Sequence, residues 1–143
     1  ASLNLVWRAW TEAELLDQWW APEPYRSETS YMDFREGGYR LYAMVSPEDE
    51  RHWGRTSYDS ISQLESFAGT DGFCDEKGVV NPDFPLAKYH NQFIAHSQGT
   101  EVIFTTEYAS VADIEAIVQM GFEEGMDMAY QNLDALLAKL VEG

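Results

Sequence analysis

Basic residues are scarce in this sequence of 143 residues. Nine Lys and Arg stand against 25 Asp and Glu, which gives a net charge of −16 at pH 7. A surface of that sign repels phosphate backbones and anionic lipid headgroups, so we expect no nucleic-acid partner and no membrane partner. The acidity is typical of a well-solvated surface, and it also fits a basic partner or a salty cytoplasm.

Cysteine and long apolar runs are scarce as well. Cys74 is the single cysteine, which excludes an internal disulfide and a cysteine cluster for zinc. No run approaches the roughly 18 consecutive apolar residues that a membrane span requires. No signal-peptide pattern is visible either. Together these absences predict a cytoplasmic protein.

Apolar residues make up 45% of the chain, and 14% of all residues are aromatic. A chain of this length and composition is expected to form one domain over residues 1–143. It can fill a core of its own and still line a cavity.

Two short helices are predicted near the N-terminus. Residues 3–10 place apolar side chains at the i, i+3, i+4, i+7 spacing of one helical face. Thr11 is a candidate N-cap that would form a capping box with Glu14. The second helix then continues until Pro22 ends it. These helices carry four of the five tryptophans, namely Trp7, Trp10, Trp19 and Trp20.

The middle of the chain is typical of antiparallel strands joined by tight turns. The predicted strands cover residues 27–35, 38–46, 52–61, 63–69, 87–97 and 100–108. Residues 70–86 form a long connection, which is either a lid or pocket rim or a plain excursion of the chain.

The chain ends with its longest predicted helix, for which Ser110 is the candidate N-cap. An apolar stripe extends over about thirty residues at helical spacing. It consists of Ile114, Val118, Gly121, Gly125, Met128, Asn132, Leu136 and Leu140. Because such a helix must bury its stripe, the sequence predicts a two-layer α+β domain in which the helix lies against the concave face of one sheet.

Several segments resemble one known family, in family order and across almost the whole chain. They are VWRAWTEAELLDQWW, DFREGGYRLYAM, YDSI, GFCDEKG, NQFIAHSQGTEV and GFEEGMDMAYQNLDALL. The chain resembles the SRPBCC (START-like, helix-grip) superfamily and, within it, the domain homologous to the activator of the heat-shock protein 90 ATPase. Ser60 and Met126 depart from the residues that relatives often carry at these positions.

This resemblance implies a helix-grip fold, with a curved antiparallel sheet of about six strands wrapped round the long C-terminal helix. Relatives open with a strand that ends about where Ala1 stands, so we expect the sheet to lack that edge strand. An unpaired edge favours association with a second chain, which makes a homodimer one expected assembly.

The sequence shows no constellation that points to a particular chemistry. His52, His90 and His96 are too few and too scattered for a metal site. No nucleophile elbow, P-loop or dinucleotide-binding fingerprint is present. The acidic surroundings of Cys74 would raise the pKa of its thiol and make it a poor nucleophile. We therefore predict no metal, no cofactor and no catalytic residue.

The resemblance also implies a pocket between sheet and helix. The strand after Gly37-Gly38 carries Arg40, Tyr42 and Met44 on one face, and in the family this face turns inward. The full predicted cavity lining is Trp20, Arg40, Tyr42, Met44, Tyr58, Phe73, Phe93, Phe104, Val118, Phe122 and Met128. An inward Arg40 needs either an internal carboxylate or an anionic ligand, unless the register is opposite or the side chain reaches solvent. Gly121 and Gly125 would allow either a close approach to the sheet or open space for a ligand.

These observations predict a START-like protein without enzymatic activity that binds a small apolar or amphipathic molecule. Two alternatives stay open. One is an enzyme of the polyketide cyclase or hydrolase type, which needs a buried titratable group beside a polar partner. The other is an interaction module that stimulates a chaperone ATPase, so that a chaperone would be its partner.

Overall fold

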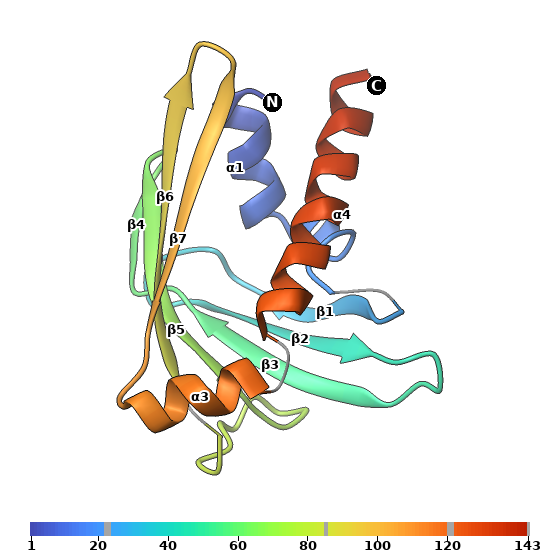
Figure 1. The fold of residues 1–143 in the computed structure, drawn as a ribbon, viewed down its shortest axis with the longest axis vertical. Coiled ribbons are helices and arrows are strands. Elements are labelled where there is room, and N and C mark those ends of the chain that lie inside the picture. Colours follow the sequence, from blue (N-terminus) through green and yellow to red (C-terminus); the bar gives the residue numbers. More distant parts are fainter. Residues whose placement is uncertain (22–23, 85, 120–121, 143) are drawn as a thin grey trace.

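A curved antiparallel sheet carries the helices on its concave side (Figure 1). The computed structural model describes residues 1–21, 24–84, 86–119 and 122–142. Its helices are α1 (Leu3–Thr11), α2 (Ala13–Leu16), α3 (Val111–Gln119) and α4 (Phe122–Glu142). Its strands are β1 (Arg26–Met32), β2 (Tyr39–Val45), β3 (Arg51–Ser57), β4 (Ser60–Ser62), β5 (Ser66–Phe73), β6 (Ala87–His96) and β7 (Gly99–Glu107).

The strands follow the order β1-β2-β3-β5-β6-β7, and β4 pairs with β5 beside this path. The sheet therefore has seven strands, and the one strand predicted over residues 52–61 is two. The chain changes partner between them, because Tyr58 N–H donates to Gly38 O whereas Asp59 N–H donates to Ala68 O. The helix-grip architecture itself is confirmed.

The two short N-terminal helices are confirmed, but the predicted cap between them is wrong. Thr11 is the last residue of α1, and its hydroxyl donates back to the carbonyl oxygen of Trp7 at 2.8 Å. The residue that precedes α2 is Glu12, which makes no side-chain capping bond.

Aromatic side chains fasten α1 to the concave face of the sheet. Trp7 is 7% exposed, and its ring meets those of Phe34, Phe67 and Phe93 with centroids 5.0–5.9 Å apart. Trp10 meets Phe93 at 6.0 Å. Edge-to-face pairs at such distances stabilise the fold beyond the area that they bury. The tryptophans of α1 therefore act as a wedge within the core.

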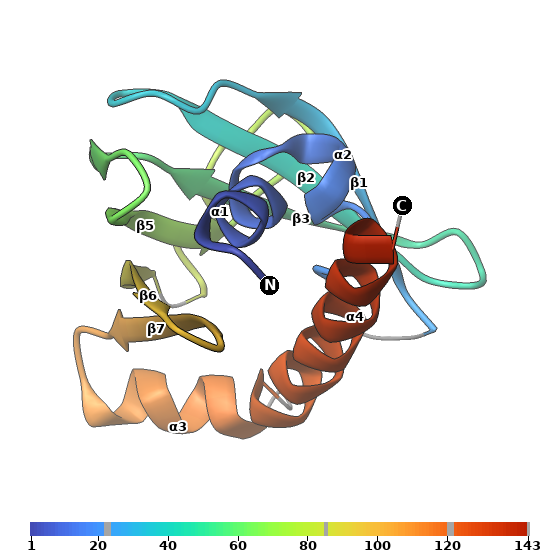
Figure 2. The same cartoon turned by 90° about the horizontal axis from the view of Figure 1, so that it is seen from above.

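The C-terminal segment is not one continuous stripe of about thirty residues. It consists of α3 and α4, whose axes point in different directions (Figures 1 and 2). The cap predicted at Ser110 is confirmed, because its Oγ accepts the N–H of Asp113 at 3.2 Å. Gly121 lies outside the described residues.

Helix α4 rests on α1 rather than directly on the sheet. Within the described residues, its Cα atoms come within 8 Å of those of α1 and α3 but of none in a strand. Its buried side chains include Ala129, Leu133 and Leu136, which belong to the same core cluster as the tryptophans of α1. Seen from above, the sheet curves round α1 while α4 closes the open side (Figure 2).

Candidate ligand-binding site

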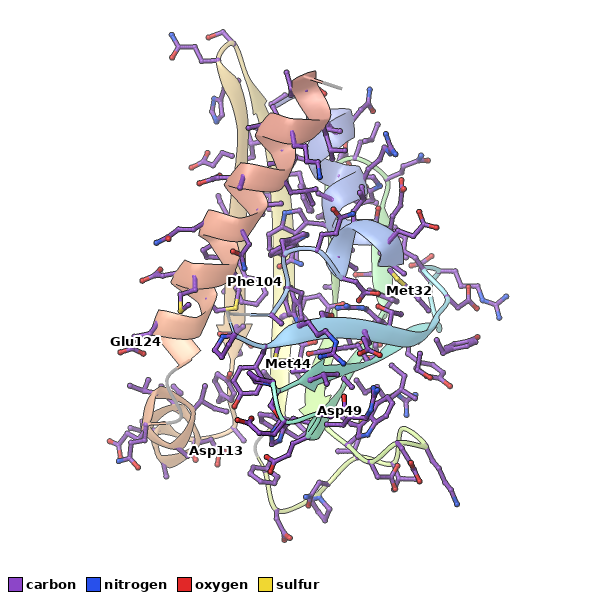
Figure 3. All side chains as sticks on the ribbon, turned by 90° about the vertical axis from the view of Figure 1, so that its right-hand side faces the viewer. Met32, Met44, Asp49, Phe104, Asp113 and Glu124 are labelled. Atoms are coloured by element: carbon purple, nitrogen blue, oxygen red, sulfur yellow. The ribbon has the colours of Figure 1, made fainter. Side chains whose placement is uncertain are left out.

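The space between the sheet and the helices contains a cavity of about 260 Å³, called here the large cavity. Strands β2, β3 and β5–β7 supply most of its walls, and α3 and α4 cover it. Met44 and Phe104 lie on the side of the sheet that faces α4 (Figure 3). The lining consists of Trp20, Tyr42, Met44, His52, Trp53, Gly54, Asp71, Gly72, Phe73, Ala87, Phe104, Thr106, Tyr108, Ile117, Gly125 and Met126.

Strand register explains how the floor of the large cavity is built. Tyr42 on β2 lies opposite Gly54 on β3, which in turn lies opposite Phe73 on β5. Side chains on such a row point to the same face of the sheet. A Cβ atom on Gly54 would lie 2.7 Å from Cζ of Tyr42, so the tyrosine ring lies over the glycine. The missing side chain thus makes room for the aromatic floor.

The neighbouring row carries the polar groups. Arg40 on β2, Thr56 on β3 and Asp71 on β5 are successive cross-strand partners. Arg40 is only 2% exposed. Its Nη2 donates to Asp17 Oδ1 at 3.1 Å and to the Ser27 hydroxyl at 3.0 Å. Of the open explanations for an inward Arg40, the structure therefore shows the internal carboxylate.

Arg40 also lies against aromatic faces. Its guanidinium carbon is 4.3 Å from the ring centroid of Tyr42 and 6.0 Å from that of Trp20. Cation–π contacts of this kind partly replace the water that a buried guanidinium has lost. The positive charge of Arg40 is therefore stabilised by protein groups alone, namely Asp17 on one side and the aromatic rings on the other.

Asp71 is the titratable group that sequence reasoning did not find. It lines the large cavity, and burial raises the pKa of its carboxyl from 3.8 to about 6, although the Thr56 hydroxyl and the Arg40 guanidinium act in the opposite direction. Burial raises the pKa of the Tyr42 phenol as well, and Asp71 adds to this effect. The cavity thus contains one carboxyl group whose charge changes in the mildly acidic range.

A second and much smaller cavity, of about 20 Å³, adjoins the first and is called here the small cavity. Trp20, Asp71 and Phe104 line both cavities and so form the wall between them. The full lining of the small cavity is Trp10, Leu16, Trp20, Arg40, Thr56, Tyr58, Phe67, Asp71, Tyr89, Asn91 and Phe104.

Most of the residues predicted to line a cavity lie at one of the two. The large cavity is lined by Trp20, Tyr42, Met44, Phe73 and Phe104, and the small cavity also takes in Arg40 and Tyr58. Whether any of them binds a ligand stays a prediction. Phe122 belongs to α4, but its side chain lies outside the described residues.

Three predicted lining residues are elsewhere. Phe93 lies in the core beside Trp7 and Trp10, because α1 covers that end of the sheet. Val118 and Met128 are 48% and 40% exposed, so they face outward. The predicted stripe treated α3 and α4 as one straight helix. In the structure, Ile117 takes the inward position instead of Val118, and Gly125 lines the cavity.

Two of the missed residues follow from strand alternation. The predicted strand ended at residue 69, whereas β5 continues to Phe73. Alternation from the buried Phe67 and Gly69 then turns Asp71 inward. On β6 the same rule places Asn91 on the face of Tyr89 and Phe93, all three of which are buried. The inward orientation of Asp71 and of Asn91 therefore follows from strand alternation once the limits of β5 and β6 are known.

The long connection after β5 is shorter than predicted. Residues 70–73 belong to the strand, and Cys74 forms an isolated bridge with Val80. Burial, reinforced by Asp75, raises the pKa of the Cys74 thiol, in the direction that the sequence predicts. The ring of Phe73 meets that of Phe84 at 5.0 Å, which ties the connection to the cavity.

The part of the chain that the structure describes holds neither a metal-binding cluster nor a membrane-spanning helix. No three His, Cys, Asp or Glu side chains gather closely enough to hold a metal ion there. None of the helices in that part of the chain combines the length and apolar character needed to cross a bilayer.

The architecture and the cavity between sheet and helices define a helix-grip domain. The family model of the Activator of Hsp90 ATPase homolog 1-like proteins matches residues 1–138, and the chain belongs to this family. A comparison with curated proteins found no match.

Solved structures agree with this assignment. Protein Ms6760 from Mycobacterium smegmatis is 29% identical, with a TM-score of 0.87 over 96% of this chain and 84% of that one. A protein from Arthrobacter aurescens solved in solution is 24% identical, with a TM-score of 0.91 over 97% of this chain and 81% of that one. At 24% identity, the likeness to the Arthrobacter aurescens protein shows the fold alone.

Arg40 and Asp17 should be energetically coupled, so that the loss of one partner costs more stability when the other is present. Replacing Asp17 by Asn leaves a buried guanidinium without its carboxylate, and we expect the free energy of unfolding to fall by about 3 kcal/mol. In an Arg40→Met background the same replacement should cost less than about 1 kcal/mol. Urea denaturation of the four proteins of this cycle measures the coupling. Equal costs in both backgrounds would contradict the assigned pairing.

Asp71 should make stability depend on pH. Because its pKa is higher in the folded protein than the ordinary 3.8, its contribution to stability is complete below about pH 4 and is lost as the pH rises through 6. An Asp71→Asn variant cannot titrate there. Its stability relative to wild type should therefore rise by up to about 3 kcal/mol between pH 4 and pH 7 and then level off.

Urea denaturation of wild type and Asp71→Asn across this pH range measures the difference in their free energies of unfolding. The other carboxyl groups are the same in both proteins, so their effects cancel in this difference. A difference that stays constant from pH 4 to pH 8, or that falls, would contradict a raised pKa at Asp71.

Proposed function

We propose that the protein binds a small apolar or amphipathic molecule in the large cavity. The observation that carries the proposal is the cavity of about 260 Å³ beneath α3 and α4. A dry cavity of roughly 150 Å³ accepts benzene, so by the same ratio this one accepts about ten non-hydrogen atoms. Binding energy would come mainly from the burial of apolar surface, and the few polar groups would set orientation.

The position of Gly125 supports this function. A glycine in the middle of a helix costs about 1 kcal/mol relative to alanine. Gly125 lines the cavity, and no described Cα atom of α4 comes within 8 Å of a strand. The absent side chain therefore leaves open space, and it does not serve a close contact between backbone and sheet.

Thermal shift measurements with small apolar and amphipathic compounds test the proposal. A compound at 100 times its dissociation constant should stabilise the protein by about 2.7 kcal/mol and raise the melting temperature by roughly 5–10 °C. A Gly125→Leu variant should fold and lose most of this shift, because the new side chain occupies the cavity. Ala135→Leu, at an exposed position of the same helix, is the matched control and should keep it.

Failure of every compound to shift the wild-type protein would count against a ligand-binding role. So would equal shifts in Gly125→Leu and in the control, since the compounds would then bind outside the cavity.

One observation favours a second candidate function, an enzyme of the cyclase or hydrolase type. Asp71 is a cavity carboxyl group with a pKa of about 6, next to Thr56 and Arg40. A general acid or base works best when its pKa lies near the operating pH. A bound compound recovered with an altered mass from wild type, but unaltered from Asp71→Asn, would favour this function over simple binding.

A further inference from the structure

Asp71 is the one acidic side chain among the described residues that line the large cavity. None of these lining residues is a Lys or an Arg. The carboxyl group therefore has no permanently charged basic side chain across the cavity from it.

The place of Asp71 in the sheet leaves one side of the carboxyl group without a polar neighbour. On β5, Asp71 lies opposite Thr56 of β3 on one side and opposite Ala87 of β6 on the other. Side chains of such a cross-strand row point to the same face. Ala87 also lines the large cavity, and its methyl group offers no hydrogen bond. The short side chain leaves room beside the carboxyl group.

The protein compensates the charge of Asp71 only in part. Its Oδ1 is buried and has no hydrogen-bond partner in the described part of the chain. Burial raises the pKa of the carboxyl group to about 6, even though the Thr56 hydroxyl and the Arg40 guanidinium both lower it. These two groups therefore act on Asp71 but do not make up for the water that it has lost. The carboxylate within 4 Å of the Arg40 guanidinium is that of Asp17.

The charges around the cavity wall add up to an excess of negative charge. Once ionised, Asp71 adds a second carboxylate to that of Asp17, and Arg40 supplies one positive charge. A buried charge without full compensation is costly. A cation in the cavity would restore neutrality, whereas an anion would add to the excess and a neutral ligand would leave it unchanged.

The rest of the lining also suits a cation. Ring faces attract an ammonium group within about 6 Å of the centroid. The guanidinium of Arg40 already lies over Tyr42, so one face of that ring is taken. The net charge of −16 raises the concentration of cations near the protein. Six aromatic residues line the cavity, namely Trp20, Tyr42, Trp53, Phe73, Phe104 and Tyr108.

We propose that the large cavity binds a small amphipathic amine, whose ammonium group pairs with the Asp71 carboxylate and whose apolar body lies among the aromatic side chains. The inference rests on the proposed binding function and adds the chemical class of the ligand. By the volume of the cavity, the amine has about ten non-hydrogen atoms. Its ammonium group carries three N–H donors, so it can donate to the carboxylate and to a second oxygen at the same time.

Two probes of nearly the same shape separate an amine site from simple apolar binding. Isothermal titration calorimetry at pH 7.5 compares 3-phenylpropylamine with 3-phenyl-1-propanol, which differ in the ammonium and hydroxyl ends. An alkylamine is protonated at this pH, as a lysine side chain is. We expect wild type to bind the amine about tenfold more tightly than the alcohol.

An isosteric variant locates the origin of this preference. Asp71→Asn keeps the shape of the side chain and removes its charge, so the preference should fall to about twofold or less. Its affinity for the alcohol should stay near the wild-type value. Asp134→Asn, at an exposed position of α4, changes the net charge by the same amount and should keep the full preference. This control separates the cavity carboxylate from the general acidity of the protein.

The preference should also depend on pH. Protonation of Asp71 between pH 7.5 and pH 5 should weaken amine binding by wild type about tenfold. His52 lines the same cavity, and a histidine that gains a proton would also repel an ammonium group. Asp71→Asn retains His52, and its affinity for the amine should change by about twofold or less. The other groups that face Asp71 are Arg40 and four phenols whose raised pKa keeps them neutral, those of Tyr42, Tyr58, Tyr89 and Tyr108.

The opposite outcomes can be told apart. Equal affinity of wild type for both probes, or tighter binding of the alcohol, would leave the binding function and overturn the amine class. So would binding of neither probe when other compounds still give a thermal shift. A preference or a pH dependence that survives in Asp71→Asn would place the ammonium group elsewhere. Binding of neither probe, with no thermal shift from any compound, would remove the binding function as well.

Discussion

The space inside this domain depends on how α1 fills the concave sheet. Trp7 and Trp10 occupy one end of the curve, where their rings meet Phe67, Phe93 and Phe104. Helix α4 then packs on α1, and α1 holds it away from the strands. At the opposite end, α3 and α4 cover the large cavity, which the side chains of Ile117 and Met126 help to line. Aromatic rings thus fill one end of the core, and the other end contains the large cavity.

The polar groups at the cavity follow one physical rule. Arg40 is buried, Asp17 balances its charge, and hydroxyl groups of β1 accept further hydrogen bonds from it. Oδ1 of Asp71, in contrast, has no hydrogen-bond partner among the described residues. The satisfied network rigidifies the wall around Arg40, whereas a buried oxygen without a partner remains costly. Two charged residues on one row of the sheet, Arg40 and Asp71, thus differ in how far the protein itself satisfies them.

The fold could be predicted from residue patterns because those patterns extend over the whole chain. The strand positions of residues 39–45 and 87–96, and the inward face of Arg40, Tyr42 and Met44, follow from alternation and from the family likeness. The residues of the C-terminal helices that line the cavity could not be predicted. The apolar stripe assumed one continuous helix, whereas α3 and α4 have different axes. Gly125 was part of the predicted stripe, whereas the buried Ala129 was not, because its small side chain adds little to a helical apolar pattern. Asp71 was missed through a strand limit four residues too early.

The cluster of Trp10, Trp19 and Trp20 has an optical consequence. The rings of Trp10, Trp19 and Trp20 lie in mutual contact, with centroids 4.8, 5.3 and 6.3 Å apart. At such separations, excitation absorbed by one indole passes to the others before it is emitted. The emission of the cluster therefore responds to the surroundings of Trp20, the ring that borders both hollows. Without any added dye, the chain therefore carries a fluorescent reporter beside the large cavity, which Trp20 lines.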